Sequence, residues 1–245
     1  MTGKAFKTTA KAQEVKAGQP IVPVTVVVDD RAATREAIIR TVRSSGHQFV
    51  ERSEWGAIAA NEGMASDWDY SMIAFHHAGR SYSCGHGADQ MRDTQEEQLG
   101  NKYDDIAYHF GIDCSGVIYE GRDIRLKGGS VRGYNTGVIG IVFLNNLTIA
   151  AEGDDIWAMG RETIERLGVN TTNVIPPLQI DAATNLISAL KSVFVIKQLG
   201  GHREFPGQAA DGKICPGNVG MEFVKNMRVV TGLLPPPMIS DRPTQ

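Results

Sequence analysis

The sequence predicts an α/β fold in which one mixed central β-sheet is flanked by helices within a single domain. Short β-branched or apolar runs, which are typical of strands, alternate with longer segments whose apolar residues recur at helical spacing. The chain of 245 residues has the length of one ordinary domain with extensions, and it is long enough to bury an apolar core without disulfides.

The N-terminal region is expected to stand outside the main domain. Residues 1–20 are cationic and polar, and we expect them to form a flexible leader. A β-branched run followed by a segment of helical periodicity predicts an accessory strand–helix extension at residues 21–47. The main domain would then occupy residues 48–232, and the Pro-rich residues 233–245 would form a disordered tail.

Strand-like segments recur through the predicted main domain. Residues 71–76 form an apolar run that ends on the first of two histidines. Residues 106–112 and 117–120 predict two strands joined by a glycine-containing hairpin turn, and residues 137–144 predict a buried strand. Residues 199–202 are interpreted as a strand that leads into a loop.

Segments between these strands predict helices, either because they are polar or because their apolar residues recur at helical spacing. Residues 90–99 are polar enough for a surface helix, and residues 180–194 carry an apolar stripe at helical spacing. Asn218 is expected to cap a final helix. The side chains expected to face inward on that helix are Met221, Val224, Met227 and Val230.

Composition and charge argue against several classes of function. The formal net charge of −3 gives no reason to expect nucleic acid as a partner and no attraction to anionic membranes. No apolar run approaches the roughly 20 residues that a membrane helix needs, so we expect no membrane insertion. The N-terminus lacks the apolar centre of a secretory signal, so we expect synthesis in the cytoplasm and any export by another route.

The three cysteines are a poor basis for a disulfide framework. One explanation is that Cys215 is kept as a thiolate for a metal. Cys84 and Cys114 are then either free buried thiols or one bridge. We favour free thiols, because unpaired cysteine is a common buried residue.

Two histidines and one cysteine could together hold a metal ion. His76 and His77 are adjacent on a strand and would point to opposite faces, so one metal would take only one of them. His202 follows two glycines, and Cys215 lies two residues after Lys213, which would favour a thiolate. Each residue alone has an ordinary structural explanation. Together, two imidazoles, one thiolate and an open position are typical of catalytic zinc.

Two residues could handle protons or charge near such a metal. Tyr108 can donate a hydrogen bond from its phenol, and Lys213 can stabilise an oxyanion or protonate a leaving nitrogen. Considered alone, Tyr108 is more typical of a strand aromatic and Lys213 of a solvated loop lysine, and periodicity cannot decide between these interpretations.

A series of short segments between residues 50 and 230 occurs in a recognisable order. They are RSEWGA at 52–57, IAFHH at 73–77, IAYHFGID at 106–113, GVIYEGR at 116–122, GYNTGVIGI at 133–141, GHR at 201–203 and CPG at 215–217. In this order they resemble the zinc amidases that include peptidoglycan recognition proteins and phage lysozyme-type N-acetylmuramoyl-L-alanine amidases. Each segment alone is a weak signal, whereas the ordered set is specific.

The resemblance implies which residues bind zinc and which act beside it. It places the first histidine of the pair, His76, on zinc together with His202 and Cys215. It gives Tyr108 a role beside the metal-bound water and Lys213 the role of a catalytic lysine, as in the phage-type branch. The recognition-only branch lacks the zinc cysteine, so the presence of Cys215 favours an enzyme.

The implied reaction is zinc-dependent hydrolysis of the amide bond between N-acetylmuramic acid and L-alanine in bacterial peptidoglycan. The residues expected to contact this substrate are His77, His109, Arg122, Asn135 and Arg203. Two alternatives stay open, namely a non-catalytic peptidoglycan-binding module and a zinc peptidase that cuts within the stem peptide.

Three departures from the family pattern bear on these expectations. Residues 207–212 look inserted before Cys215, which bears on the position of Lys213. Ser130 stands where the family usually has a histidine, so a substrate contact is altered. Val142 stands where a related branch has a catalytic glutamate, so the tyrosine beside the metal would carry that role.

The expected lack of a secretory signal fits two biological roles. A phage endolysin, or an antibacterial effector delivered by contact-dependent secretion, would each reach the cell wall in the periplasm or outside without one. An immunity protein or a secretion-system component could then be a partner, with residues 21–47 and the Pro-rich tail as docking elements.

Overall fold

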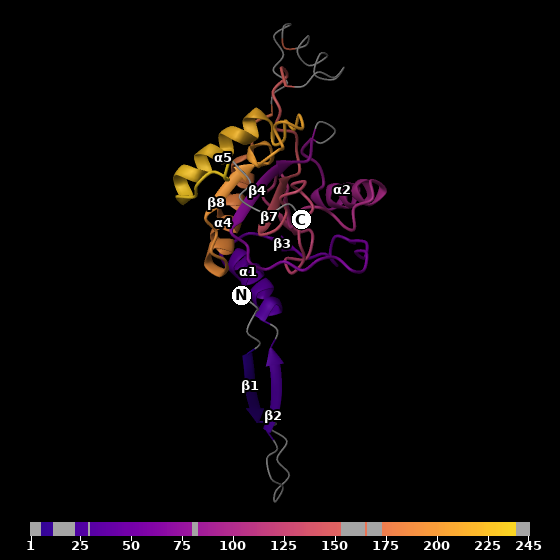
Figure 1. Cartoon of the computed structure of the whole chain (residues 1–245), viewed down its shortest axis with the longest axis vertical. Coiled ribbons are helices and arrows are strands. Elements are labelled where there is room, and N and C mark those ends of the chain that lie inside the picture. The colour runs from indigo at the N-terminus through magenta and orange to yellow at the C-terminus, as the bar shows by residue number, and fades with distance from the viewer. Residues whose placement is uncertain are drawn as a thin grey trace, which may run out of the picture.

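A computed structural model of the protein describes residues 6–11, 23–28, 30–79, 83–152, 165 and 173–238. Within these residues, six strands form one mixed sheet in the order β3-β6-β5-β7-β4-β8 (Figure 1). The strands are β3 (Phe49–Val50), β4 (Met72–His77), β5 (Phe110–Ile112), β6 (Ile118–Glu120), β7 (Val138–Phe143) and β8 (Gln198–Gly201). Strands β5, β7, β4 and β8 run parallel, whereas β6 is antiparallel to β5 and β3 is parallel to β6. The predicted mixed sheet is confirmed.

Helices cover both faces of this sheet. They are α1 (Asp30–Ser44), α2 (Gly87–Gly100), α4 (Pro177–Val193) and α5 (Gly217–Thr231). Helices α1, α4 and α5 share one face, where Ile38, Leu186 and Val224 join a common core. Helix α2 lies across the sheet from them (Figure 1), and its Met91 joins a second core cluster with Trp55. None of the described helices has the length and apolar composition to cross a membrane.

Helix α1 is tied to the sheet by packing and by charge. Ile38, Ile39 and Val42 are buried in the same core as α4. The guanidinium of Arg35 donates two hydrogen bonds to the Glu120 carboxylate, both 2.6 Å long, and this pair joins α1 to β6. The helix predicted as part of an accessory extension therefore contributes to the core of the main domain.

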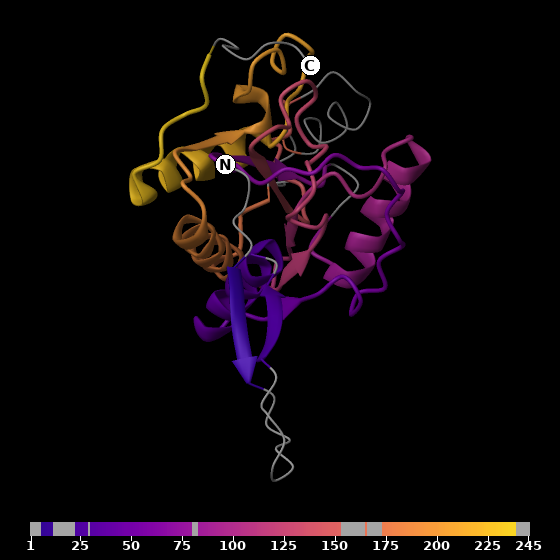
Figure 2. The same ribbon diagram turned by 60° about the horizontal axis from the view of Figure 1, so that its bottom comes forward.

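The two N-terminal strands lie outside the central sheet. Strand β1 (Phe6–Lys11) pairs antiparallel with β2 (Pro23–Val28), and this two-stranded ribbon projects from the body of the protein beyond α1 (Figures 1 and 2). Strand β2 matches the predicted β-branched strand. The sequence does not predict β1, which lies inside the expected flexible leader, because this segment becomes a strand only through pairing with β2.

Two expectations about the last helix are wrong. Helix α5 begins at Gly217 behind Pro216 rather than at a cap formed by Asn218, whose backbone N–H donates to the Glu152 carboxylate at 2.7 Å. Val230 is 70% exposed, because the buried stripe of α5 ends at Met227.

The first part of the predicted disordered tail packs against the sheet. The backbone of Leu234 accepts a hydrogen bond from the Leu199 N–H at 2.9 Å and donates one to the Lys197 carbonyl oxygen at 3.0 Å. Leu233 is buried. The expectation of disorder is therefore wrong for residues 233–238, and the rest of that tail lies outside the described residues.

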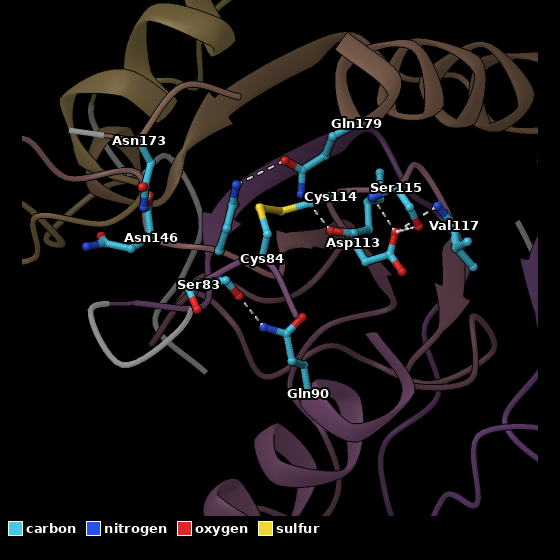
Figure 3. Close-up of a disulfide and its surroundings, with 12 residues drawn as sticks. Ser83, Cys84, Gln90, Asp113, Cys114, Ser115, Val117, Asn146, Asn173 and Gln179 are labelled. Carbon is cyan, nitrogen blue, oxygen red and sulfur yellow. Dashed lines mark hydrogen bonds between the residues drawn. A yellow bond between two sulfur atoms is a disulfide. The ribbon is translucent and has the colours of Figure 1, made fainter. Parts of the chain in front are cut away.

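Cys84 and Cys114 form a disulfide, so the prediction of free thiols is wrong (Figure 3). The bond joins the segment before α2 to the turn between β5 and β6, with a Cα–Cα distance of 5.5 Å. In that turn, the Asp113 carboxylate accepts hydrogen bonds from the backbone N–H groups of Ser115 and Val117, at 2.9 and 3.0 Å. Cys84 is exposed and Cys114 half-buried, so neither lies in the apolar core that the prediction assumed.

Replacing both cysteines by serine tests the contribution of this bond to stability. The disulfide joins residues that are 30 positions apart, which predicts a loss of about 3–4 kcal/mol in the free energy of unfolding for the Cys84→Ser/Cys114→Ser variant. Urea denaturation followed by circular dichroism measures the loss, with chemically reduced wild-type protein as the matched control. A loss below ~1 kcal/mol in both samples would contradict the expectation.

Candidate metal centre

Two parallel strands bring the first two candidate ligands together. Strand β4 ends at His77 and its neighbour β8 ends at Gly201, with Phe75 opposite Gly201 in the register. His76 therefore lies close to His202, the residue that follows β8. Their ring centroids are 4.6 Å apart.

The pleat of β4 separates the two adjacent histidines. Phe75 belongs to the core beneath α4 and α5, whereas Ala74 belongs to a cluster on the opposite face. His76, two residues after Ala74, points to the same face of the sheet as Ala74. His77 points to the same face as Phe75, and its Nδ1 accepts a hydrogen bond from the Leu147 N–H at 3.1 Å. The His77 side chain is therefore directed away from the face that carries His76.

Cys215 approaches the histidines from the segment that leads into α5. Its Sγ lies 3.6 Å from Nδ1 of His76. The Arg203 N–H donates to the Cys215 carbonyl oxygen at 3.0 Å, which ties the cysteine to the 3-10 turn after β8. Gly201 permits this close packing, because a Cβ at its position would lie 2.7 Å from Cδ of Pro216.

The donor atoms fit a divalent cation. One ligand atom from each of His76, His202 and Cys215 lies within 4.8 Å of the others. Nε2 of His76 is buried and has no hydrogen-bond partner among the described residues. Leaving a buried nitrogen unpaired costs free energy, which a bound ion and its water would offset. Two imidazoles and one thiolate suit a borderline-soft cation such as zinc, and three protein ligands leave one position open.

Burial sets the protonation states of these groups. It holds the pKa of His76 well below its ordinary value and also lowers the pKa of His202, so both imidazoles are neutral and can bind a cation. Burial raises the pKa of the Cys215 thiol to about 12, and the His77 backbone N–H and the nearby Arg203 oppose that shift. A cation at the centre would supply the charge that a thiolate needs.

Tyr108 stands beside the three ligands. Its ring centroid lies 4.9 Å from that of His76. Burial raises the pKa of Tyr108 above its ordinary value, and a hydrogen bond with the Gln98 side chain opposes the shift. The phenol is therefore protonated at neutral pH and can donate a hydrogen bond. Gln98 is itself held by the Ala107 N–H, which donates to its Oε1 at 2.7 Å.

Two of the candidate ligands, His202 and Cys215, open onto a cavity of about 400 Å³, and His76 lies buried behind them. Tyr108, His202 and Cys215 line it together with Lys213, whose side chain is exposed. Lys213 thus shares the cavity with the ligands despite the inserted residues 207–212, and its ammonium group can act on charge that develops there.

Two residues expected to contact substrate make hydrogen bonds in the protein interior. His109 is buried, with its Nδ1 accepting from the Gly140 N–H and its Nε2 contacting the Leu126 carbonyl oxygen, both at 3.0 Å. Arg122 donates to three backbone carbonyl oxygens, among them that of Ile106 at 2.7 Å. The structure places both residues in supporting positions, and their contact with substrate stays a prediction.

Asn135 and Arg203 hold neighbouring segments in place. Oδ1 of Asn135 accepts a hydrogen bond from the Val131 N–H at 2.7 Å. Arg203 donates to Glu152 at 3.2 Å and to Asn218 at 2.9 Å. For these residues too, a role in substrate binding stays a prediction.

Sequence reasoning does not identify two glutamines at the site. Gln98 holds the phenol of Tyr108, and Oε1 of Gln208 lies 3.0 Å from Nε2 of His202. Neither glutamine belongs to a motif or to an apolar stripe, so the sequence carries no signal for them.

The chain is similar to a known family over most of the described domain. The family model described as N-acetylmuramoyl-L-alanine amidase matches residues 66–218. Peptidoglycan recognition protein 3 of Mus musculus is 39% identical over 79 residues, which are 31% of this chain and 22% of that protein. The chain spans less than two thirds of the length of the first curated relatives that it matches.

Solved structures share the fold. Drosophila PGRP-LB matches with a TM-score of 0.56 and 25% identity, over 80% of this chain and 99% of that chain. The N-acetylmuramoyl-L-alanine amidase LysC from Clostridium intestinale URNW matches with a TM-score of 0.55 and 19% identity, over 76% of this chain and 98% of that chain.

Replacing Cys215 by serine tests the metal centre. Loss of a group that merely orients a ligand typically costs about 10–100-fold in metal affinity, so loss of a direct ligand should cost more than ~100-fold. Competition with a chromogenic chelator measures the Zn²⁺ affinity of wild type and Cys215→Ser, and His86→Ala, which changes an exposed histidine, is the control. Equal affinities of Cys215→Ser and wild type would exclude Cys215 as a ligand.

Proposed function

The chain belongs to the N-acetylmuramoyl-L-alanine amidase family, and we propose that it hydrolyses the amide bond between N-acetylmuramic acid and L-alanine in bacterial peptidoglycan with the help of one zinc ion. The observation that carries the proposal is the clustering of His76, His202 and Cys215 within 4.8 Å, beside a cavity that His202 and Cys215 line together with Tyr108 and Lys213. The names of the similar proteins, which are peptidoglycan recognition proteins and an amidase, support the substrate class.

The ligand set supports an enzyme over a binding module. His76, His202 and Cys215 would hold zinc and leave one coordination position for a reacting group. The chemistry that a bound zinc supplies is activation of a water nucleophile and polarisation of the scissile carbonyl group.

Two side chains of the cavity would handle charge and protons during amide hydrolysis. The Tyr108 phenol, which stays protonated because burial raises its pKa, would orient the water and donate a hydrogen bond to it or to the substrate. The Lys213 ammonium would stabilise negative charge on the lactyl carbonyl oxygen and could donate a proton to the departing alanine nitrogen.

The disulfide bears on where the protein acts. A bond between Cys84 and Cys114 supports action in an oxidising compartment, such as the periplasm or the outside of the cell, where peptidoglycan lies. Within that setting we propose an antibacterial role as a phage endolysin or a secreted effector, with an immunity protein or a secretion-system component as a further partner of the effector.

Digestion of purified sacculi tests the reaction. Zinc-loaded protein should release stem peptides with a free N-terminal alanine, detected by mass spectrometry, and Cys215→Ser should release none. Peptides cut inside the stem would instead indicate a peptidase. Binding to sacculi without any product would indicate a recognition module and would overturn the proposed hydrolysis.

Replacing Lys213 by alanine tests its role at the carbonyl oxygen. Loss of an oxyanion donor typically costs about 2.7–4 kcal/mol, so turnover of sacculi by Lys213→Ala should fall roughly 100- to 1,000-fold. Zinc affinity should stay near that of wild type, because Lys213 is not a ligand. Lys225→Ala, which removes an exposed lysine of α5, is the matched control. Normal turnover of Lys213→Ala would remove this residue from the mechanism.

A further inference from the structure

The inserted loop carries one buried polar side chain, that of Gln208. Only 1% of this residue is exposed, although its loop lies at the surface. Its Oε1 lies 3.0 Å from Nε2 of His202. Its Nε2 donates to the Arg132 carbonyl oxygen at 2.9 Å and to the Pro206 carbonyl oxygen at 3.3 Å. The carboxamide is thus held on both sides.

These contacts determine which way the Gln208 carboxamide faces. A backbone carbonyl oxygen can only accept a hydrogen bond, so the amide nitrogen must be the group that faces Arg132 and Pro206. The amide oxygen then faces His202 and can only accept. Nε2 of His202 must therefore carry the hydrogen, and its Nδ1 keeps a lone pair.

The main chain of Gln208 is hydrogen-bonded to that of Lys213. The Gln208 carbonyl oxygen accepts a hydrogen bond from the Lys213 N–H at 3.1 Å, and the Gln208 N–H donates to the Phe205 carbonyl oxygen at 3.1 Å. Gln208 thus closes the base of the inserted loop next to the 3-10 turn that carries His202. Among the described residues, it is the only hydrogen-bond partner of the His202 ring.

We propose that Gln208 is a positioning residue of the metal centre, which holds His202 in the Nε2–H tautomer so that Nδ1 is the atom presented to the cation. This inference rests on the metal site of the proposed function, but not on the reaction or its substrate. Hydrogen bonds from metal-ligating histidines to acceptors in the next layer fix the tautomer and the ring orientation, and their loss lowers metal affinity. The inserted loop then has a function, which is to supply this acceptor.

The tautomer can be measured directly in metal-free protein. Long-range ¹H–¹⁵N correlation spectra of the histidine rings should show His202 as the Nε2–H form in wild type. In Gln208→Leu, which removes the acceptor, the Nδ1–H form should become populated. An Nδ1–H tautomer in wild type would overturn the proposal even if no variant folded.

Metal affinity supplies a second readout that needs no amidase activity. Competition with a chelator should show Zn²⁺ binding about 10–100-fold weaker in Gln208→Leu than in wild type. Asp211→Ala, which changes an exposed residue of the same loop, should leave the Zn²⁺ affinity unchanged. Wild-type affinity in Gln208→Leu would overturn the proposal. A protein that binds Zn²⁺ with this pattern but leaves sacculi intact would refute only the proposed reaction.

Discussion

The candidate site depends above all on the parallel pairing of β4 with β8. In parallel strands the carboxyl ends lie at the same edge of a sheet, so the residues that follow them meet there. Phe75 pairs with Gly201, and the residues that follow them, His76 and His202, are the two histidines of the candidate centre. A shift of this register by one residue would bring His77 beside β8 and would turn the His76 imidazole away from His202 and Cys215.

The third ligand depends on how closely α5 packs against the end of β8. A Cβ at Gly201 would lie 2.3 Å from Sδ of Met221 and 2.7 Å from Cδ of Pro216, so only glycine allows the start of α5 to lie this near. The proximity of Cys215 to His76 is therefore a consequence of backbone packing rather than of the length of the preceding loop. The fully buried strand β4 and the small residues of β8 together form a rigid support, which a preorganised metal site requires.

The sequence predicts those features that local patterns determine. Apolar runs locate β4 and β7, and the alternation of side chains along a strand separates His76 from His77, as the structure shows. Donor chemistry predicts His202 and Cys215 as further ligands, whereas family resemblance selects His76 over His77 and gives Tyr108 and Lys213 their roles. Local patterns fail where contacts join distant segments. The Cys84–Cys114 bond depends on two turns that are 30 residues apart, and Val230 continues a helical stripe beyond the part of α5 that is buried.

The inserted residues 207–212 show why spacing alone misleads at this site. Counted along the chain, they lengthen the path from His202 to Cys215 and call the position of Lys213 into question. In space, the hydrogen bond from the Lys213 N–H to the Gln208 carbonyl oxygen closes the loop at its base, so the extra residues project from a point where the two ends already meet. Surface loops accept such insertions at small entropic cost, because the closure term grows only slowly with length. The position of Lys213 is therefore set by the loop base, which the buried side chain of Gln208 anchors to the rest of the domain, and not by the number of residues in the loop.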